Sequence, residues 1–346
     1  MTRPKEETSM KKPFGILPDQ QQASLYTISG GKLTACISDF GATLVKLYVP
    51  DAEGNAADVV LGFDDANDYA GSTSYFGATV GRNANRVKGG AFTLNGKKIQ
   101  MPVNDNSNNL HSGPDSYSFR IWEVEKHTEN AISFRLNSPD GDQGLPGNAL
   151  IRVSYTLEAP ATLRIRYDAI CDKDTVFNLT NHSYFNLAGH DKPEKAMSQV
   201  LSMPARFFNP DDAQSIPTGE LRSVAGTPMD FRAPKPIGRD LNEDYDALEL
   251  QGGYDHNFEV FTDPCAILSD PESGRTMAVS TDCPGIQFYS GNFLKGETGK
   301  DGVSYCFRGG IALETQFNPD SVNHPEWPQP ITPANTPYHS ETCYRF

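Results

Sequence analysis

One histidine, His182, lies among short polar side chains in the stretch NLTNHSYFNL, residues 178–187. If this stretch is a single β-strand, successive side chains point to opposite faces. The face that carries His182 then also carries Asn178, Thr180, Tyr184 and Asn186, and the opposite face carries Phe177, Leu179, Phe185 and Leu187. A row of neutral hydrogen-bonding groups is typical of a sugar pocket, whereas a solvent-facing row would favour Lys, Glu and Arg. A histidine held by hydrogen bonds in the core is the alternative interpretation.

A glutamate occupies a comparable position in the stretch IALETQFNPD, residues 311–320. Alternation places Glu314 in a second polar row with Ala312, Gln316 and Asn318, opposite Ile311, Leu313, Thr315 and Phe317. A carboxylate can accept a proton and an imidazole can donate one, so Glu314 and His182 could act as general base and acid. Taken alone, Glu314 is better explained as a carboxylate on a wet strand face.

Three further segments combine side chains that suit the binding of several hydroxyl groups. They are GRNANRVKGG with Arg82, Asn85 and Arg86, NDNSNNLHSG with Asn108, Asn109 and His111, and GGYDHNF with Asp255 and His256. Each segment alone is also explained by turns, in which Asn, Asp and Gly satisfy local backbone groups. The sequence shows no metal-ligand spacing, Walker loop or G-x-S-x-G elbow, so we expect no metal site.

The elements that must position these residues are strands. Apolar and polar side chains alternate in residues 151–158 and 163–169, and the short segment between them predicts an antiparallel hairpin. The pair Asn95 and Gly96 predicts a tight turn between two more short strands. Further strands are expected at residues 58–63, 131–136, 256–261, 275–280 and 310–317, and a short helix only within residues 240–250.

These patterns predict an all-β protein whose antiparallel sheets pack face to face in a large β-sandwich. The 30 Gly and 25 Pro residues are spread along all 346 residues, which is typical of many turns and marks no linker. We therefore assign residues 23–346 to a single domain. Residues 1–22, rich in Lys, Glu and Gln, are assigned to an N-terminal extension that could be disordered.

The composition argues against two classes of partner. A formal net charge of -14 repels nucleic acid and anionic membrane surfaces. The six cysteines include no C-x-x-C pair, which favours reduced thiols, with disulfides formed after export as the alternative. Residues 1–22 show no signal peptide, so we expect a cytoplasmic protein, or a periplasmic one if a leader was removed. We expect a monomer or a weak dimer.

Taken together, five segments resemble the ordered motifs of the aldose 1-epimerase family, whose members are also called galactose mutarotases. The segments are GRNANRVKGG, NNLHSG, NLTNHSYFNLAGH, GGYDHNF and GGIALETQFNPDSVNHP, and the resemblance spans residues 34–346. It implies a galactose mutarotase-like β-supersandwich without a metal or another cofactor. It also implies that the protein interconverts the α and β anomers of free aldohexoses such as galactose and glucose.

Residue by residue, the resemblance implies that His182 is the catalytic acid and Glu314 the catalytic base. The sugar-binding residues that it implies are Asn85, Arg86, His111, Asp255 and Gln287, and the polar row around His182 adds Tyr184. One position departs from the family pattern, because Ser112 stands where a glycine usually follows the histidine that His111 matches.

The chemistry implied needs one acid and one base, because ring opening removes a proton from the C1 hydroxyl and adds one to the ring oxygen. A glutamate with a pKa of about 4.3 can accept the first proton, and a histidine with a pKa of about 6.5 can supply the second. Three alternatives stay open. A hexose-6-phosphate 1-epimerase would need a basic cluster beyond Arg82 and Arg86, a glycoside hydrolase could use Asp255 and Glu314, and a carbohydrate-binding protein would need no catalyst.

Overall fold

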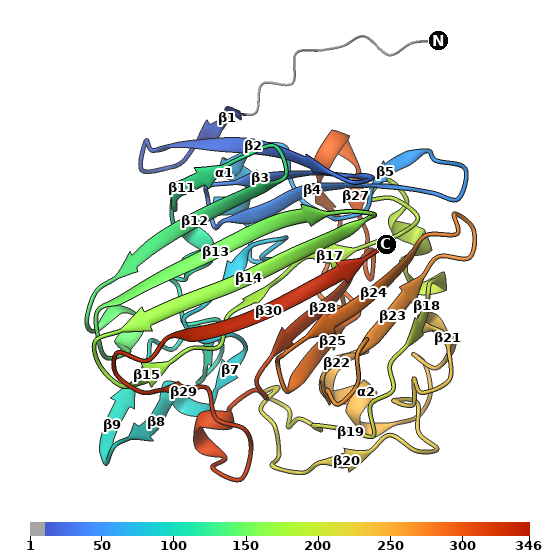
Figure 1. Cartoon of the computed structure of the whole chain (residues 1–346). Coiled ribbons are helices and arrows are strands. Elements are labelled where there is room, and N and C mark those ends of the chain that lie inside the picture. The colour runs from blue at the N-terminus through green and yellow to red at the C-terminus, as the bar shows by residue number, and fades with distance from the viewer. Residues whose placement is uncertain (1–10) are drawn as a thin grey trace.

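The alternating pattern forms long antiparallel strands in the computed structural model, which describes residues 11–346 (Figure 1). The largest sheet has nine strands in the order β11-β12-β13-β14-β30-β24-β23-β18-β21. Its strands are β11 (Glu123–His127), β12 (Ala131–Ser138), β13 (Ala149–Glu158), β14 (Thr162–Cys171), β18 (Val200–Ser202), β21 (Lys235–Pro236), β23 (Ala266–Ser269), β24 (Thr276–Thr281) and β30 (Tyr338–Arg345).

A six-stranded sheet, in the order β17-β28-β25-β22-β19-β20, packs against the nine-stranded sheet. Its strands are β17 (Tyr184–Phe185), β19 (Phe207–Phe208), β20 (Arg222–Ser223), β22 (Asp255–Glu259), β25 (Gly285–Tyr289) and β28 (Ile311–Gln316). The ring of Phe185 in β17 lies 5.0 Å from that of Tyr344 in β30, and the hydroxyl groups of Thr315 and Thr342 share a hydrogen bond. The two sheets therefore meet face to face, as expected for a sandwich.

A five-stranded sheet in the order β1-β2-β3-β4-β5 lies at the top of the view in Figure 1. Its strands are β1 (Lys11–Ile16), β2 (Gln22–Gly30), β3 (Leu33–Ser38), β4 (Thr43–Pro50) and β5 (Ala56–Asp58). The two-stranded sheets are β6 (Thr79–Val80) with β16 (Thr180–Asn181), β7 (Arg86–Val87) with β10 (Asn109–Leu110), β8 (Ala91–Leu94) with β9 (Lys97–Gln100), β15 (Thr175–Val176) with β29 (Ile331–Thr332), and β26 (Glu297–Thr298) with β27 (Ser304–Tyr305).

The α-helices in the described part of the chain are short, α1 (Ala66–Ala70) and α2 (Asp246–Gln251). Helix α2 overlaps the segment where the sequence allowed a helix, whereas α1 was not expected. No helix within residues 11–346 is long and apolar enough to cross a membrane. The strand prediction for an all-β sandwich is confirmed.

Most individual strand predictions are also confirmed. Strands β13 and β14 pair antiparallel as the predicted hairpin, and Asn95 and Gly96 have φ angles of 51° and 74° in the turn between β8 and β9. The other predicted strands correspond to β12, β22, β24 and β28. The strand expected at residues 58–63 is wrong beyond Asp58, because the backbone there makes separate hydrogen bonds to β4 and to Tyr184 and forms no continuous ladder.

The prediction that residues 178–187 form one strand is wrong. Residues 180–181 form β16, which pairs with β6, and residues 184–185 form β17, which pairs with β28 in the six-stranded sheet. His182 and Ser183 lie between the two short strands. The chain changes its pairing partner at this point, and a change of partner leaves no mark in the alternation of side chains.

The predicted N-terminal extension ends earlier than expected. Residues 11–16 form β1, which pairs with β2, so residues 11–22 belong to the folded part of the chain. Phe14 and Leu17 are buried in a hydrophobic cluster, which explains why this segment is ordered. The rest of the predicted extension, residues 1–10, lies outside the described residues.

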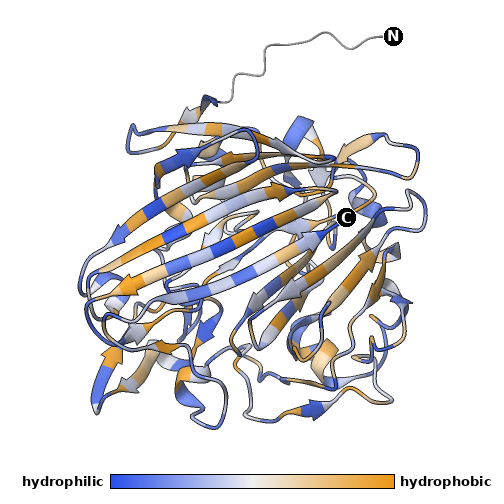
Figure 2. Cartoon of the chain, viewed as in Figure 1, coloured by the Kyte–Doolittle hydropathy of each residue, from blue (hydrophilic) through white to orange (hydrophobic). Residues whose placement is uncertain are grey.

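Alternation along the strands separates the sandwich core from a second, polar face. Figure 2 shows hydrophilic and hydrophobic residues alternating along the long strands. In β28, Ile311 and Leu313 join the main core, and Ala312 belongs to a separate cluster on the opposite face. Burial of a side chain such as Ile311 or Leu313 contributes about 1.5 to 3 kcal/mol to the free energy of folding. This contribution fixes the register of β28 and therefore the face on which Glu314 lies.

Candidate active site

The polar face of the six-stranded sheet carries a set of side chains that lie side by side across four strands. The cross-strand partners on this face are Gln287 with Glu314, Asp255 with Tyr289, Tyr289 with Ala312, and Ala312 with Tyr184. Residues opposite each other in register share a face. The sheet therefore brings Asp255, Glu314 and Tyr184 together, although they are distant in the sequence.

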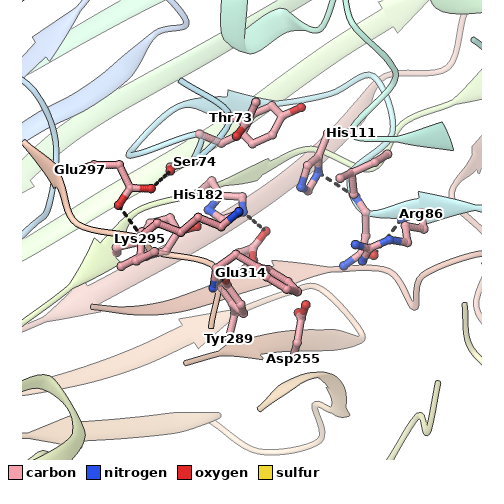
Figure 3. Close-up of a pocket in the computed structure, with 16 residues that line it drawn as sticks. Thr73, Ser74, Arg86, His111, His182, Asp255, Tyr289, Lys295, Glu297 and Glu314 are labelled. Atoms are coloured by element: carbon pink, nitrogen blue, oxygen red, sulfur yellow. Dashed lines mark hydrogen bonds and ion pairs between the residues drawn. The ribbon is translucent and has the colours of Figure 1, made fainter. Parts of the chain in front are cut away.

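A cavity of about 310 Å³ opens above this face (Figure 3). Of the eight residues that the sequence assigned to the site, seven line the cavity, namely Asn85, Arg86, His111, His182, Tyr184, Asp255 and Glu314. The pairing of β7 with β10 contributes three of them, because it places Arg86 opposite Leu110 and so brings Asn85 next to His111.

The backbone of His182 is held by the turn that precedes β6. Its N–H donates to the Ala78 carbonyl oxygen at 2.9 Å, and its own carbonyl oxygen accepts from the Gly77 N–H at 2.9 Å. Gly77 has a φ angle of 64°, and a Cβ at this position would lie 2.0 Å from the carbonyl oxygen of Leu44. Only glycine fits there, so this turn depends on Gly77.

His182 and Glu314 face each other across a buried gap. The distance from His182 Nε2 to Glu314 Oε2 is 3.6 Å, and Figure 3 shows the two side chains pointing toward one another. Their side chains are 8% and 3% exposed. Neither His182 Nδ1 nor Glu314 Oε2 has a hydrogen-bond partner among the described residues, which is unfavourable in a core but suits a site that receives a polar ligand.

Burial moves the pKa of both groups. Desolvation lowers the pKa of His182 from 6.5 to about 4. Desolvation, together with the charge of Asp255, raises the pKa of Glu314 well above 4.5, although the positive charge of Arg86 opposes this. Burial therefore favours the uncharged form of both groups.

His111 is a neutral hydrogen-bond donor. The backbone N–H of Asn85 donates to His111 Nδ1 at 3.1 Å, so the ring proton must be on Nε2. Burial and the neighbouring His182 lower the pKa of His111 well below 6.5, which keeps the ring uncharged. A neutral ring with a proton on Nε2 can donate to a sugar oxygen.

The residue after His111 keeps the backbone shape that a glycine would allow. Ser112 has a φ angle of 69°, in the left-handed region. Its hydroxyl group accepts from the Asn83 N–H at 2.8 Å and donates to the Asn83 carbonyl oxygen at 3.0 Å. The departure from the family pattern at Ser112 therefore adds two hydrogen bonds between the loops that carry Asn85 and His111.

Arg86 and Asp255 are each oriented by a second residue. Arg86 Nε donates to Asp105 Oδ2 at 2.7 Å. The side-chain amide of Gln287 donates to Asp255 Oδ1 at 2.8 Å. Gln287 thus lies against Asp255 and does not line the cavity, unlike the other predicted sugar-binding residues. Burial raises the pKa of Asp255, and the charge of Arg86 and the hydrogen bond from Gln287 oppose this rise.

Two histidines and a glutamate lie close enough to suggest a metal site. One potential ligand atom from each of His111, His182 and Glu314 lies within 4.8 Å of the others. A metal needs an unprotonated nitrogen from each histidine. The Asn85 N–H already occupies Nδ1 of His111 and leaves the proton on Nε2, so this ring is set up to donate a hydrogen bond and fits a metal poorly.

Several polar residues that the sequence placed near the site instead support the fold. Asn178 accepts from the Phe317 N–H, and Asn186 contacts the backbone of Ala188 and Lys192. Arg82 is fully buried, and its guanidinium donates to groups that include the Pro146 carbonyl oxygen and the Thr175 hydroxyl. Asn178 and Asn181 are both buried.

The sequence predictions missed part of the cavity wall. Tyr75 and Tyr289 line the cavity, together with residues of two loops, which are Thr73, Ser74, Phe293, Leu294, Lys295 and Glu297. The two loops meet where the Ser74 hydroxyl donates to Glu297 Oε1 at 3.5 Å (Figure 3). The segments GNF at residues 291–293 and YFG at residues 75–77 are the signals in the sequence that could have drawn attention to these loops. Neither segment has a spacing of residues that indicates chemistry.

The family model for aldose 1-epimerase matches residues 24–345. The chain belongs to the aldose 1-epimerase family. Galactose mutarotase from Bos taurus is 39% identical over 339 residues, which cover 96% of this chain and 97% of that protein. Aldose 1-epimerase from Haemophilus influenzae is 38% identical over 347 residues, which cover 99% of each chain. The resemblance seen in the sequence motifs is thereby confirmed.

Solved structures of aldose 1-epimerase relatives share the fold. An aldose epimerase homologue from C. elegans superposes with a TM-score of 0.86 at 32% identity, covering 93% of this chain and 98% of that one. Galactose 1-epimerase from Lactobacillus acidophilus gives a TM-score of 0.84 at 26% identity, covering 97% and 98% of the two chains. The large antiparallel sandwich is therefore the aldose 1-epimerase fold.

Proposed function

We propose that this protein is a cofactor-independent aldose 1-epimerase that interconverts the α and β anomers of free hexoses such as galactose and glucose. The observation that carries the proposal is the buried pair His182 and Glu314, whose Nε2 and Oε2 atoms face each other at 3.6 Å in a polar cavity. Membership of the aldose 1-epimerase family supports the same reaction.

The pair supplies the acid and the base that anomer exchange requires. Glu314 accepts the proton of the C1 hydroxyl while His182 donates a proton to the ring oxygen, so the bond between C1 and the ring oxygen breaks and an aldehyde forms. Rotation about the C1–C2 bond and the reverse transfers close the ring with either configuration. Each positioned transfer typically contributes a factor of about 10² to 10⁴ in rate.

The pKa values of the pair are compatible with these roles. Burial favours the protonated carboxyl of Glu314, and a C1 hydroxyl that donates a hydrogen bond to Glu314 favours its ionised form. The proton then passes to His182, 3.6 Å away. Either distribution provides one acid and one base, which a reversible reaction needs in both directions.

The remaining polar groups orient the sugar. His111 donates from Nε2, Arg86 donates from its guanidinium, and Asp255 accepts, so the hydroxyl groups away from C1 find partners of both kinds. Asn85 and Tyr184 complete the set from the loop and from β17. Fixing these hydroxyls restricts motion to C1, which lowers the entropic part of the barrier.

Charge in the cavity favours a free hexose over a hexose 6-phosphate. Arg86 is already paired with Asp105 at 2.7 Å, and Arg82 is buried away from the cavity. The other cavity-lining cation, Lys295, lies beside Glu297, which accepts from its backbone N–H at 2.9 Å. A phosphate would meet Asp255, Glu297 and Glu314 without a cluster of free cations to receive it.

Polarimetry tests the proposal. Freshly dissolved α-galactose or α-glucose should reach the same final rotation faster with the protein than without it, and His182→Asn and Glu314→Gln should each lose most of this acceleration. Unchanged kinetics with the wild type would refute the proposal. Cleavage of a disaccharide would indicate a glycoside hydrolase. Saturable sugar binding without acceleration would indicate a carbohydrate-binding protein. Stronger competition by galactose 6-phosphate than by galactose would indicate a sugar-phosphate epimerase.

We also propose a cytoplasmic location. All six cysteines are free thiols in the structure, which is typical of a reducing compartment. Fractionation of cells that express the full chain would test this, and recovery in a periplasmic fraction would contradict it.

A further inference from the structure

Two tyrosine rings lie nearly parallel to the ring of His182. The ring of Tyr184 lies 5.1 Å from that of His182 with an interplanar angle of 23°, and the ring of Tyr75 lies 5.9 Å away with the same angle. Tyr184 comes from β17, whereas Tyr75 comes from the turn before β6. The imidazole therefore packs against two aromatic rings, and its Nε2 atom lies 3.6 Å from Glu314 Oε2.

Tyr75 is held in this position by an unfavourable backbone and by several contacts. Its φ angle is 55°, which a bulky side chain rarely adopts. The Ala78 N–H donates to the Tyr75 carbonyl oxygen at 3.0 Å, and the same turn is joined to the backbone of His182 through Gly77 and Ala78. Backbone conformations of this kind persist where the surrounding structure imposes them, and they are concentrated at functional sites.

Further aromatic contacts fix the ring of Tyr75 from its other side. It lies 5.3 Å from the ring of Phe119 and 4.8 Å, edge on, from the ring of His111. Tyr75 therefore contacts both histidines that line the cavity. Tyr289, which also lines the cavity, contacts Tyr184 and not His182.

We propose that Tyr75 is a positioning residue, which with Tyr184 holds the His182 ring so that only the Nε2 edge, opposite Glu314, is open to the sugar. This inference rests on the proposed epimerase function of the site. The two rings exclude water from the imidazole, which favours its uncharged form. Tyr75 thereby sets both the direction and the proton affinity of the acid.

Other titratable groups also face His182. They are Glu314 from β28 at 3.6 Å and His111 from the loop after β10, with Arg86 and Asp255 elsewhere on the cavity wall. Desolvation is the largest cause of the low pKa of His182. Removing the Tyr75 ring admits water to His182 and leaves Glu314, Arg86 and Asp255 in place. His111, which the ring also contacts, titrates as a separate signal in the same experiment.

The test compares Tyr75→Asn with Tyr75→Phe. Asparagine tolerates the left-handed backbone, so Tyr75→Asn removes the ring without adding strain, and Tyr75→Gly repeats the change without a polar group. Tyr75→Phe is the matched control, because it keeps the ring and removes only the hydroxyl. NMR of the labelled imidazole follows the titration of His182, with His182→Asn identifying its signal, and polarimetry gives kcat and KM.

We expect Tyr75→Asn to raise the pKa of His182 from about 4 toward 6.5 and to lower kcat about tenfold, with a smaller change in KM. Tyr75→Phe should behave as the wild type. An unchanged His182 titration in a folded Tyr75→Asn protein would overturn the proposal. So would an equal loss of kcat in Tyr75→Phe, because it would assign the effect to the hydroxyl. The NMR result stands even if the wild type shows no epimerase activity, so the two proposals can fail separately.

Discussion

The burial of His182 should make the stability of this protein depend on pH in a specific way. The folded chain lowers the pKa of His182 from 6.5 to about 4, whereas the unfolded chain restores the ordinary value. The unfolded state therefore binds a proton at this site between these two pH values, and the folded state does not. Stability from this group is fully present above pH 6.5 and is lost as the pH falls toward 4.

The magnitude follows from the two pKa values. The difference of about 2.5, at about 1.4 kcal/mol for each pH unit, corresponds to about 3 kcal/mol in the free energy of unfolding. Linkage places about 2 kcal/mol of the loss between pH 7 and pH 5, and about 3 kcal/mol by pH 4. His182→Asn removes the titrating group, so the variant should lose this much less stability than the wild type over the same range.

Urea unfolding of both proteins at pH 7, 6, 5 and 4, followed by the fluorescence of Trp122 and Trp327, measures this difference. Other buried groups, such as His256 with a pKa lowered to about 3, are present in both proteins and cancel. Lost contacts of the imidazole shift the comparison by a constant that does not depend on pH. Only the slope of the difference with pH therefore reports the titration of His182.

The same comparison in a Glu314→Gln background separates burial from charge. Because desolvation is the main cause of the low pKa of His182, the slope should persist when the carboxyl group is absent. A difference that stays constant between pH 7 and pH 5 in both backgrounds would refute the reasoning, because it would mean that water reaches the imidazole in the folded state.

Three further predictions concern the residues around the pair. Burial raises the pKa of Glu314, so the wild type should lose stability relative to Glu314→Gln as the pH rises above 4.5. Urea unfolding at pH 5 and pH 8 measures the difference in the free energy of unfolding between the two proteins. A difference that does not grow with pH would mean that the carboxyl group is solvated. Gly77→Ala should lower the free energy of unfolding by more than about 3 kcal/mol in thermal or urea unfolding, because the added Cβ would meet the Leu44 carbonyl oxygen. Gly89 has a similar φ angle and open space around it, so Gly89→Ala should cost only about 1 kcal/mol. Equal losses of stability in the two variants would contradict the steric argument. Gln287→Leu should raise KM about tenfold with little change in kcat, because Asp255 loses a hydrogen bond worth about 1.5 kcal/mol. A fall in kcat without a change in KM would instead place Gln287 in the chemical step.

Local patterns in the sequence determined the fold class and most of the strands. The hairpin of β13 and β14 and the turn at Asn95 and Gly96 depend on neighbouring residues alone, so alternation and turn chemistry were sufficient. The side of β28 on which Glu314 lies was also predictable, because the hydrophobic residues that alternate with it must face the core.

Motif order in the sequence also indicated the family and six of the residues that line the cavity, and the polar row around His182 added Tyr184. It did not separate a group that touches the cavity from one that supports such a group. Gln287 orients Asp255, and Asn178 and Asn186 bind backbone groups, although all three share the polar character of the true lining residues. The difference depends on where neighbouring strands lie.

The tertiary structure alone decided the break at His182, the rings that cover it and the proton affinities of the pair. Tyr75 and Glu314 come from segments far from His182 in the chain, and their approach to it depends on strand pairings between distant residues, whereas Tyr184 lies only two residues away. A pKa depends on how much water reaches a group and on which charges surround it. Sequence therefore determined which side chains could act as acid and base, and packing determined where the proton resides and how the acid is aimed.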